Sequence, residues 1–223
     1  MNLIQLQEIE SKHSHTIKNT MDSERRLSAI KYLFNIAYVF KHSRETFHLS
    51  VSIMDKYTSR FQTYDETDLL MLTVCSMIAS KYEEDIIGEH KTILEYMKVT
   101  NGGFKKREVI LYEIHMLNII EYQLRIPLLT NVSDFYFPLF NISQHLAKRH
   151  RVLFDIVQKY SEVLCSFKKS TIVISSILMG MGKHKSGFDY NDYEILDQNK
   201  LSVETCMSML NQIMRIEDFK FIQ

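Results

Sequence analysis

A cluster of charged side chains ends the most apolar stretch of the chain, residues 65–85. Lys81 stands there beside Tyr82, and Glu83 and Glu84 come directly after them. In a helix, Lys81 would suit the C-terminal end, whereas both acids would stand where the helix dipole is already negative. Residues that conflict with such local structural preferences are often found at functional sites. This corner is therefore the first candidate for binding a partner through charged contacts.

The other reactive side chains form no catalytic or metal-binding pattern in the sequence. The nine histidines include no HExxH pair, and the three cysteines have no CxxC spacing. Gly102-Gly103 is typical of a turn and is not part of a phosphate-binding loop. We therefore expect no catalytic residue, no metal, no cofactor and no small-molecule substrate, and the chain is not expected to be an enzyme.

The charge balance argues against a nucleic-acid binder. The 223 residues include 27 basic and 27 acidic ones, a formal net charge of zero, whereas a dedicated nucleic-acid-binding protein needs a basic face. The apolar stretch is too short to cross a bilayer, and the N-terminus lacks the apolar core of a cleavable signal. The cysteine usage fits a reducing compartment. We expect an intracellular protein of the nucleus and/or the cytoplasm that binds neither nucleic acid nor membrane.

Composition and periodicity predict an all-α fold. The chain has only two prolines and six glycines, and helix-forming residues dominate between them. Residues 69–79 are apolar except Thr73 and Ser76, which predicts a central helix buried on all sides. Apolar residues at three- and four-residue spacing predict further helices over about residues 1–19, 23–41, 45–61, 90–97 and 105–123.

Pro127 marks the best boundary, because proline disfavours helix at the residue before it. Helical spacing returns beyond it, and residues 171–180 supply a second helix that is apolar nearly all round. Ser175-Ser176-Ile177-Leu178 matches Cys75-Ser76-Met77-Ile78 at an offset of 100 residues, which suggests a duplicated unit. The predicted organisation is a short N-terminal helical segment, a first unit and a divergent second unit, at residues 1–22, 23–127 and 128–223.

The charged corner carries a family resemblance. Ala79-Ser80-Lys81-Tyr82-Glu83-Glu84 resembles the end of the central helix in the cyclin box. Cyclins share a scattered signature of Arg, Asp, Leu, Lys and Glu, which is matched here, motif by motif, by Arg26, Asp55, Leu70, Lys81 and Glu113. The resemblance covers about residues 23–140, and it implies two tandem five-helix repeats, each around a central buried helix.

The resemblance also implies roles for these residues. Arg26 and Asp55 would form a buried structural pair, whereas Lys81 and Glu113 would bind the segment leading into the αC helix of a protein kinase. Four apolar or aromatic residues would form the floor beneath that segment: Tyr82, Leu117, Tyr122 and Leu124. Glu83 and Glu84 would face basic residues of the kinase. Without the resemblance, Lys81 would be taken as an ordinary solvated lysine at a helix end.

One family feature is degenerate in this chain. Many cyclins carry a groove on the first helix of the box that docks substrates containing an Arg-x-Leu motif. The matching positions here are Arg25, Ser28, Ala29, Tyr32 and Asn35. They lack the large apolar residues, the Trp and the acid of the family pattern, so we expect weak docking there.

The sequence thus predicts a cyclin-like regulatory subunit that binds and allosterically activates a cyclin-dependent Ser/Thr kinase in cell-cycle control. A transcription-type cyclin is one alternative, and a cyclin-fold basal transcription factor or scaffold without kinase activation is another. A transcription factor of this fold needs a strongly basic face, which a neutral chain lacks. Loss of the kinase partner is disfavoured because Lys81 and Glu113 are both present.

Overall fold

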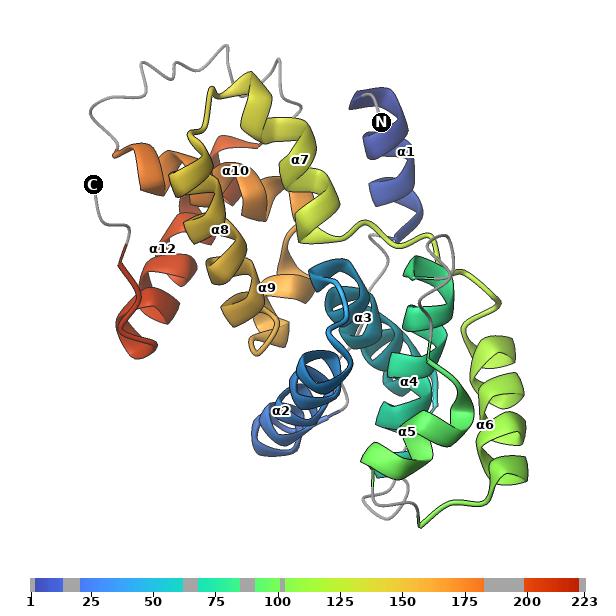
Figure 1. The fold of residues 1–223 in the computed structure, drawn as a ribbon. Coiled ribbons are helices and arrows are strands. Elements are labelled where there is room, and N and C mark those ends of the chain that lie inside the picture. Colours follow the sequence, from blue (N-terminus) through green and yellow to red (C-terminus); the bar gives the residue numbers. More distant parts are fainter. Residues whose placement is uncertain are drawn as a thin grey trace. The chain divides into compact units, whose positions relative to one another are not determined.

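Helices make up every regular element that the computed structural model describes (Figure 1). The described residues are 3–13, 21–61, 68–84, 91–100, 103–182 and 199–220. The predicted all-α fold is confirmed. The chain divides into two compact units: the first unit comprises residues 16–126, and the second unit comprises residues 1–15 with 127–223.

The first unit is built around one central helix. Its helices are α2 (Ser23–Phe40), α3 (Arg44–Arg60), α4 (Asp68–Glu83), α5 (Ile93–Val99) and α6 (Lys106–Ile119). Helix α4 contacts each of the other four, and every residue from Met71 to Ser80 is buried. This matches the prediction from the apolar run, because a helix without a polar face has to be covered on all sides.

Side-chain caps set the starts of several helices in this unit. Helix α2 begins at Ser23, with Asp22 as N-cap, whose side chain accepts a hydrogen bond from the Arg25 amide. The Ser43 hydroxyl caps α3 in the same way through the Thr46 amide. Such caps satisfy amides that the first helical turn leaves without partners.

Helix α6 is shorter than the sequence pattern predicts. It ends at Ile119, not near Gln123, because Glu121 and Tyr122 adopt left-handed backbone angles, with φ of 58° and 54°. The Tyr122 amide then donates to the Leu117 carbonyl over 2.9 Å, which closes the helix end. The segment that follows leads to Pro127 without regular structure.

The second unit also has one helix buried along most of its length. Its described helices are α1 (Leu3–His13), α7 (Leu129–Leu139), α8 (Gln144–Val157), α9 (Ser161–Ser166), α10 (Lys169–Met181) and α12 (Lys200–Ile216). Helix α10 is buried from Ser170 to Leu178 and contacts α7, α8 and α12. Helix α12 has no counterpart among the helices expected from the sequence.

The N-terminal helix α1 belongs to this second unit. Leu6 lies in its core, and the buried Glu10 carboxylate accepts hydrogen bonds of 2.7 Å from both the amide and the hydroxyl of Ser170. A carboxylate in this position satisfies the first amides of α10 and complements its dipole. Among the described helices, none has the length and apolarity needed to span a bilayer.

Candidate partner-binding site

An ion pair joins the exposed end of α4 to the middle of α6. Lys81 Nζ lies 2.6 Å from Glu113 Oε1, and the two side chains are 40% and 14% exposed. A pair this accessible adds little to stability. The ammonium group of Lys81 has three donor hydrogens and the Glu113 carboxylate has two acceptor oxygens, so both can also bind a partner's backbone.

Aromatic side chains on the same two elements are exposed. Tyr82, which follows Lys81, is 43% exposed, and Tyr122, just beyond α6, is 61% exposed. Leu117 and Leu124, the other residues of the predicted apolar floor, are half-buried. The four side chains therefore leave apolar surface uncovered in the isolated chain.

Glu83 and Glu84 lie in different environments although they are neighbours in the sequence. Glu83 is half-buried, and its pKa is raised, first by burial and then by the nearby carboxylates of Glu45 and Glu84. Glu84 is only 7% exposed. The expectation that Glu84 faces a partner is therefore wrong for the structure of this chain.

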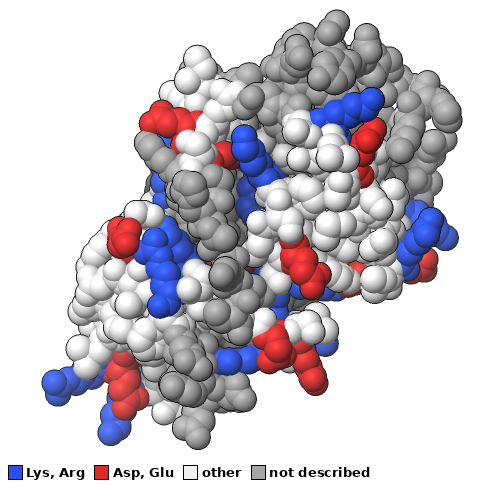
Figure 2. All heavy atoms as spheres, turned by 180° about the vertical axis from the view of Figure 1, so that it is seen from behind, with Lys and Arg blue, Asp and Glu red and all other residues white. Residues whose placement is uncertain are grey.

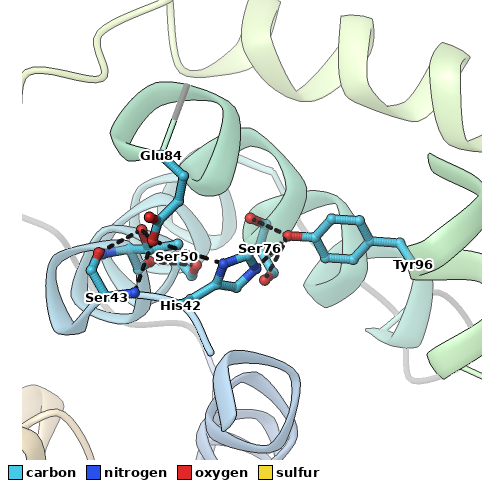
Figure 3. Close-up of polar contacts among 7 residues, drawn as sticks. His42, Ser43, Ser50, Ser76, Glu84 and Tyr96 are labelled. Carbon is cyan, nitrogen blue, oxygen red and sulfur yellow. Dashed lines mark hydrogen bonds and ion pairs between the residues drawn. The ribbon is translucent and has the colours of Figure 1, made fainter. Parts of the chain in front are cut away.

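The start of α3 explains why Glu84 turns inward (Figure 3). Glu84 Oε1 accepts hydrogen bonds from the Ser43 amide at 2.8 Å and from the Thr46 hydroxyl at 2.6 Å. Burial alone would raise the pKa of Glu84, but these bonds outweigh it and lower that pKa below its ordinary value. The positive end of the α3 dipole favours the carboxylate in the same way.

The same network continues through His42 to Tyr96 (Figure 3). His42 Nδ1 lies 3.8 Å from Glu84 Oε1, and His42 Nε2 lies 2.9 Å from the Tyr96 hydroxyl. That hydroxyl donates to the Ser76 carbonyl over 3.1 Å. Burial lowers the pKa of His42, so the neutral ring is favoured. The network ties the end of α4 to the start of α3 and to α5.

Two of the three structural signature residues, Arg26 and Asp55, are in contact as the resemblance implies. Both nitrogens at the tip of Arg26 donate to the Asp55 carboxylate, one of them over 3.0 Å, and both side chains are buried. Leu70, the third of these residues, is half-buried at the start of α4. Arg26 and Asp55 thus join α2 to α3 inside the first unit.

The residues of the degenerate groove differ from expectation in two ways. Arg25 is not a free charge at the rim, because it makes a two-pronged contact with Asp68, with Nε 2.6 Å from Oδ2. Ala29 is only 3% exposed and so adds almost no surface to an open slot. Ser28 and Asn35 are exposed, as a groove would require.

The Tyr32 hydroxyl also forms its hydrogen bond within the chain. This hydroxyl lies 3.0 Å from Thr73 Oγ1, and burial raises the pKa of Tyr32. The groove positions therefore present less free polar and apolar surface than their sequence alone indicates.

Lys56 is a residue whose importance the sequence pattern did not reveal. It is only 8% exposed, and its ammonium group lies 2.7 Å from Gln123 Oε1, just beyond α6. The signal in the sequence is a lysine inside an otherwise buried part of α3, from Ile53 to Thr58. Long cationic side chains are rarely buried without a specific partner.

Charges on the surface are of mixed sign. In the face shown in Figure 2, basic and acidic side chains are interspersed among uncharged ones. Among the described residues, no group of three or more His, Cys, Asp or Glu side chains is arranged to hold a metal ion.

Comparison with known proteins identifies a family for the first part of the chain. The family model for the cyclin N-terminal domain matches residues 1–125. The human G2/mitotic-specific cyclin-B3 is 22% identical over 186 residues, which cover 80% of this chain and 13% of the human protein. For eight of the curated cyclins that it matches, the chain spans only 13–32% of their length.

Solved structures share the fold over nearly the whole chain. A viral cyclin from herpesvirus saimiri superposes with a TM-score of 0.73 at 15% identity and covers 97% of this chain and 99% of the viral chain. A chain of the yeast RNA Pol II CTD kinase CTDK-1 complex gives a TM-score of 0.71 at 14% identity, over 96% of this chain and 72% of the yeast chain. At sequence identities this low, these similarities show a shared fold only.

Proposed function

The chain belongs to the cyclin family, and from this premise we propose that it is a regulatory subunit that binds a cyclin-dependent protein kinase. The observation that carries the proposal is the Lys81–Glu113 pair, 2.6 Å apart where α4 and α6 meet, with the Lys81 side chain 40% exposed and that of Glu113 14% exposed. The resemblance assigns these two positions to the segment leading into the kinase αC helix. Both residues are present and placed to act together.

The surroundings of the pair support an interface. Tyr82 on α4 and Tyr122, just beyond α6, are exposed aromatic residues. Large aromatic side chains next to a few well-placed polar groups are typical of the residues that dominate binding energy in protein interfaces. Glu83 retains enough exposure to meet a basic residue of the kinase, whereas Glu84 supports the site from within.

The proposed consequence of binding is allosteric activation. A subunit held against the αC segment shifts that helix inward, so that its Glu pairs with the catalytic Lys of the kinase, and it helps to order the activation loop. This mechanism needs no catalytic group from the cyclin. Since the curated relative described above is G2/mitotic-specific, we place the proposed role in cell-cycle control, inside the cell.

The test begins with identification of the kinase. Affinity purification of the tagged chain with mass spectrometry names the kinase, which is then produced in recombinant form for binding and activity assays. We expect the double variant Lys81→Ala, Glu113→Ala to lose binding and activation. Its melting temperature should stay close to that of the unaltered chain, because the pair is partly accessible to solvent, with the Lys81 side chain 40% exposed, and such pairs add little stability.

A matched control comes from the second unit. Lys159 and Glu217 form a pair of 2.8 Å with exposures of 32% and 23%. The double variant Lys159→Ala, Glu217→Ala removes a comparable pair within the second unit and should still bind the kinase. If the Lys81→Ala, Glu113→Ala variant binds and activates the kinase as well as this control does, the assigned face is wrong.

A further inference from the structure

The segment after α6 has a backbone conformation that needs support. Glu121 and Tyr122 both lie in the left-handed region, with φ of 58° and 54°. This conformation is unfavourable for residues other than glycine. Two such residues in succession keep it only when the surrounding structure fixes them. This segment carries Tyr122 and Leu124, two residues of the proposed kinase-binding face. The contacts that hold it therefore bear on binding.

Lys56 of α3 makes the most buried of these contacts. Its Nζ donates to Gln123 Oε1 over 2.7 Å and lies 3.4 Å from the Gln123 backbone carbonyl. A lysine that is only 8% exposed needs such acceptors for its ammonium group. Both acceptors come from one residue of the segment after α6, so Lys56 fixes the position of the residue directly between Tyr122 and Leu124.

Arg60, one helical turn after Lys56, holds the beginning of the same segment. Its Nη1 donates to the Ile119 carbonyl over 2.8 Å and lies 3.1 Å from Glu121 Oε1. The carbonyls of the last helical turn otherwise lack a partner within the helix. Gln123 Nε2 in turn donates to Glu121 Oε2 over 2.9 Å, which links the two contacts. We call these residues, Lys56, Arg60, Glu121 and Gln123, the α3 clamp.

The clamp includes a charge that is costly to keep. Burial, followed by the neighbouring charge of Arg60, lowers the pKa of Lys56 to about 8. The charged form of Lys56 is therefore less stable in the folded chain than in water. An apolar residue would fit the interior of the first unit with less loss of solvation, and such local conflicts are typical of positions with a functional task.

We propose that Lys56 and Arg60 are positioning residues, which hold the segment after α6 so that Tyr122 and Leu124 face the kinase. The proposal rests on the proposed function for the identity of the partner. Neither cation needs to touch the kinase. They act through Gln123, Glu121 and the carbonyl of Ile119, by fixing a backbone conformation that the segment would otherwise leave.

The first experiment measures the segment in the free chain. Because the chain has no tryptophan, Tyr122→Trp places a single tryptophan on the segment, which can be excited without exciting the tyrosines. Adding Lys56→Met should lower the steady-state anisotropy of this reporter, whereas adding Lys56→Arg, which keeps a donor, should restore most of it. Lys31→Met removes an exposed lysine from α2 and should leave the anisotropy unchanged. No kinase takes part, so this result does not depend on the proposed function.

The second experiment measures kinase binding with Tyr122 in place. We expect Lys56→Met to weaken binding about tenfold or more and Lys56→Arg to recover most of that loss. Gln123→Ala removes the acceptor from an exposed side chain, so this variant should fold normally and weaken binding in the same direction. Circular dichroism of each variant shows that it is folded.

The two experiments separate the possible failures. If Lys56→Met and Gln123→Ala both leave binding unchanged, the positioning role is overturned, whatever the reporter shows. An unchanged reporter anisotropy in Lys56→Met also overturns it. If the Lys81→Ala, Glu113→Ala variant binds normally, the proposed binding face fails, while the anisotropy result still decides whether Lys56 holds the segment.

Discussion

Arg26 on α2 and Asp55 on α3 form a two-pronged ion pair inside the first unit, with side chains that are only 2% and 7% exposed. Burial raises the pKa of the Cys75 thiol on α4, and the nearby Asp55 carboxylate raises it further. The pair therefore lies where α2, α3 and the central helix meet. Each partner satisfies a charge that the other would leave buried and uncompensated.

Removal of one partner should be costly for this reason. We expect Asp55→Ala to reduce the free energy of unfolding by roughly 3–5 kcal/mol, because it leaves the Arg26 guanidinium buried without its acceptor. Urea unfolding followed by circular dichroism measures the change. Asp134→Ala, which removes the exposed partner of Arg151, is the control and should cost less than about 1 kcal/mol. Equal losses in the two variants would show that burial does not make the Arg26–Asp55 pair special.

Some of this arrangement could be predicted from the sequence. The central helix followed from an apolar run without a polar face, and the Arg26–Asp55 pair followed from its match to the cyclin signature. Helix α12 lies outside the predicted helices, although Val203, Cys206 and Leu210 are apolar residues at helical spacing and are buried in the structure.

Other features depend on contacts that no local pattern encodes. Glu83 and Glu84 are identical in type and adjacent, but only Glu84 reaches the amide of Ser43 at the start of α3. Which of two neighbouring acids turns inward depends on where another helix begins. The same holds for Lys56, whose acceptor at Gln123 is 67 residues away in the chain.

The two acids should therefore respond differently to substitution. Glu84→Ala leaves the part-buried Ser43 amide and the buried Thr46 hydroxyl without their acceptor, so we expect a loss of about 1–3 kcal/mol in the free energy of unfolding. Glu83→Ala should change stability by less than about 0.5 kcal/mol and act mainly on kinase binding. Thermal unfolding and a binding assay on both variants measure these effects. Equal stability of the two variants would contradict an internal role for Glu84.

His150 in the second unit should make stability depend on pH. The ring is buried beside Phe137 and Phe154, and burial lowers its pKa from 6.5 to about 4. Between these values the unfolded chain binds a proton that the folded chain does not. The contribution of His150 to the free energy of unfolding is therefore fully present above pH 6.5, and it is lost as the pH is lowered toward 4. At about 1.4 kcal/mol per pKa unit the full loss is about 3 kcal/mol.

The measurement is the free energy of unfolding from pH 7 to pH 4. His150→Phe keeps an aromatic ring and removes the titrating group, so its stability should fall less over this range than that of the unaltered chain. His145, which is exposed on the same helix, provides the control variant His145→Phe, with an unchanged slope. Parallel pH curves for the unaltered chain and His150→Phe would exclude His150 as the source.

The groove positions on α2, from Arg25 to Asn35, should bind Arg-x-Leu peptides poorly. Such a peptide needs an acid for its Arg and an apolar slot for its Leu. Asp68, the acid beside this helix, is already paired with Arg25, and Asn35 carries no charge. Ala29 is buried, and the hydroxyl of Tyr32 is bonded to the side chain of Thr73. The structure thus offers neither a free acid nor a deep slot among these positions.

The missing contacts set the expected size of the effect. A charge-assisted hydrogen bond contributes about 1.5–3 kcal/mol, and the lost apolar contact about as much again. Together they should weaken binding by roughly a hundredfold or more relative to an intact groove. Fluorescence polarisation with a labelled Arg-x-Leu peptide measures the affinity, and Asn35→Glu, which restores an acid, should improve it. Micromolar or tighter binding by the unaltered chain, lost in Tyr32→Ala, would show instead that these positions form a working groove.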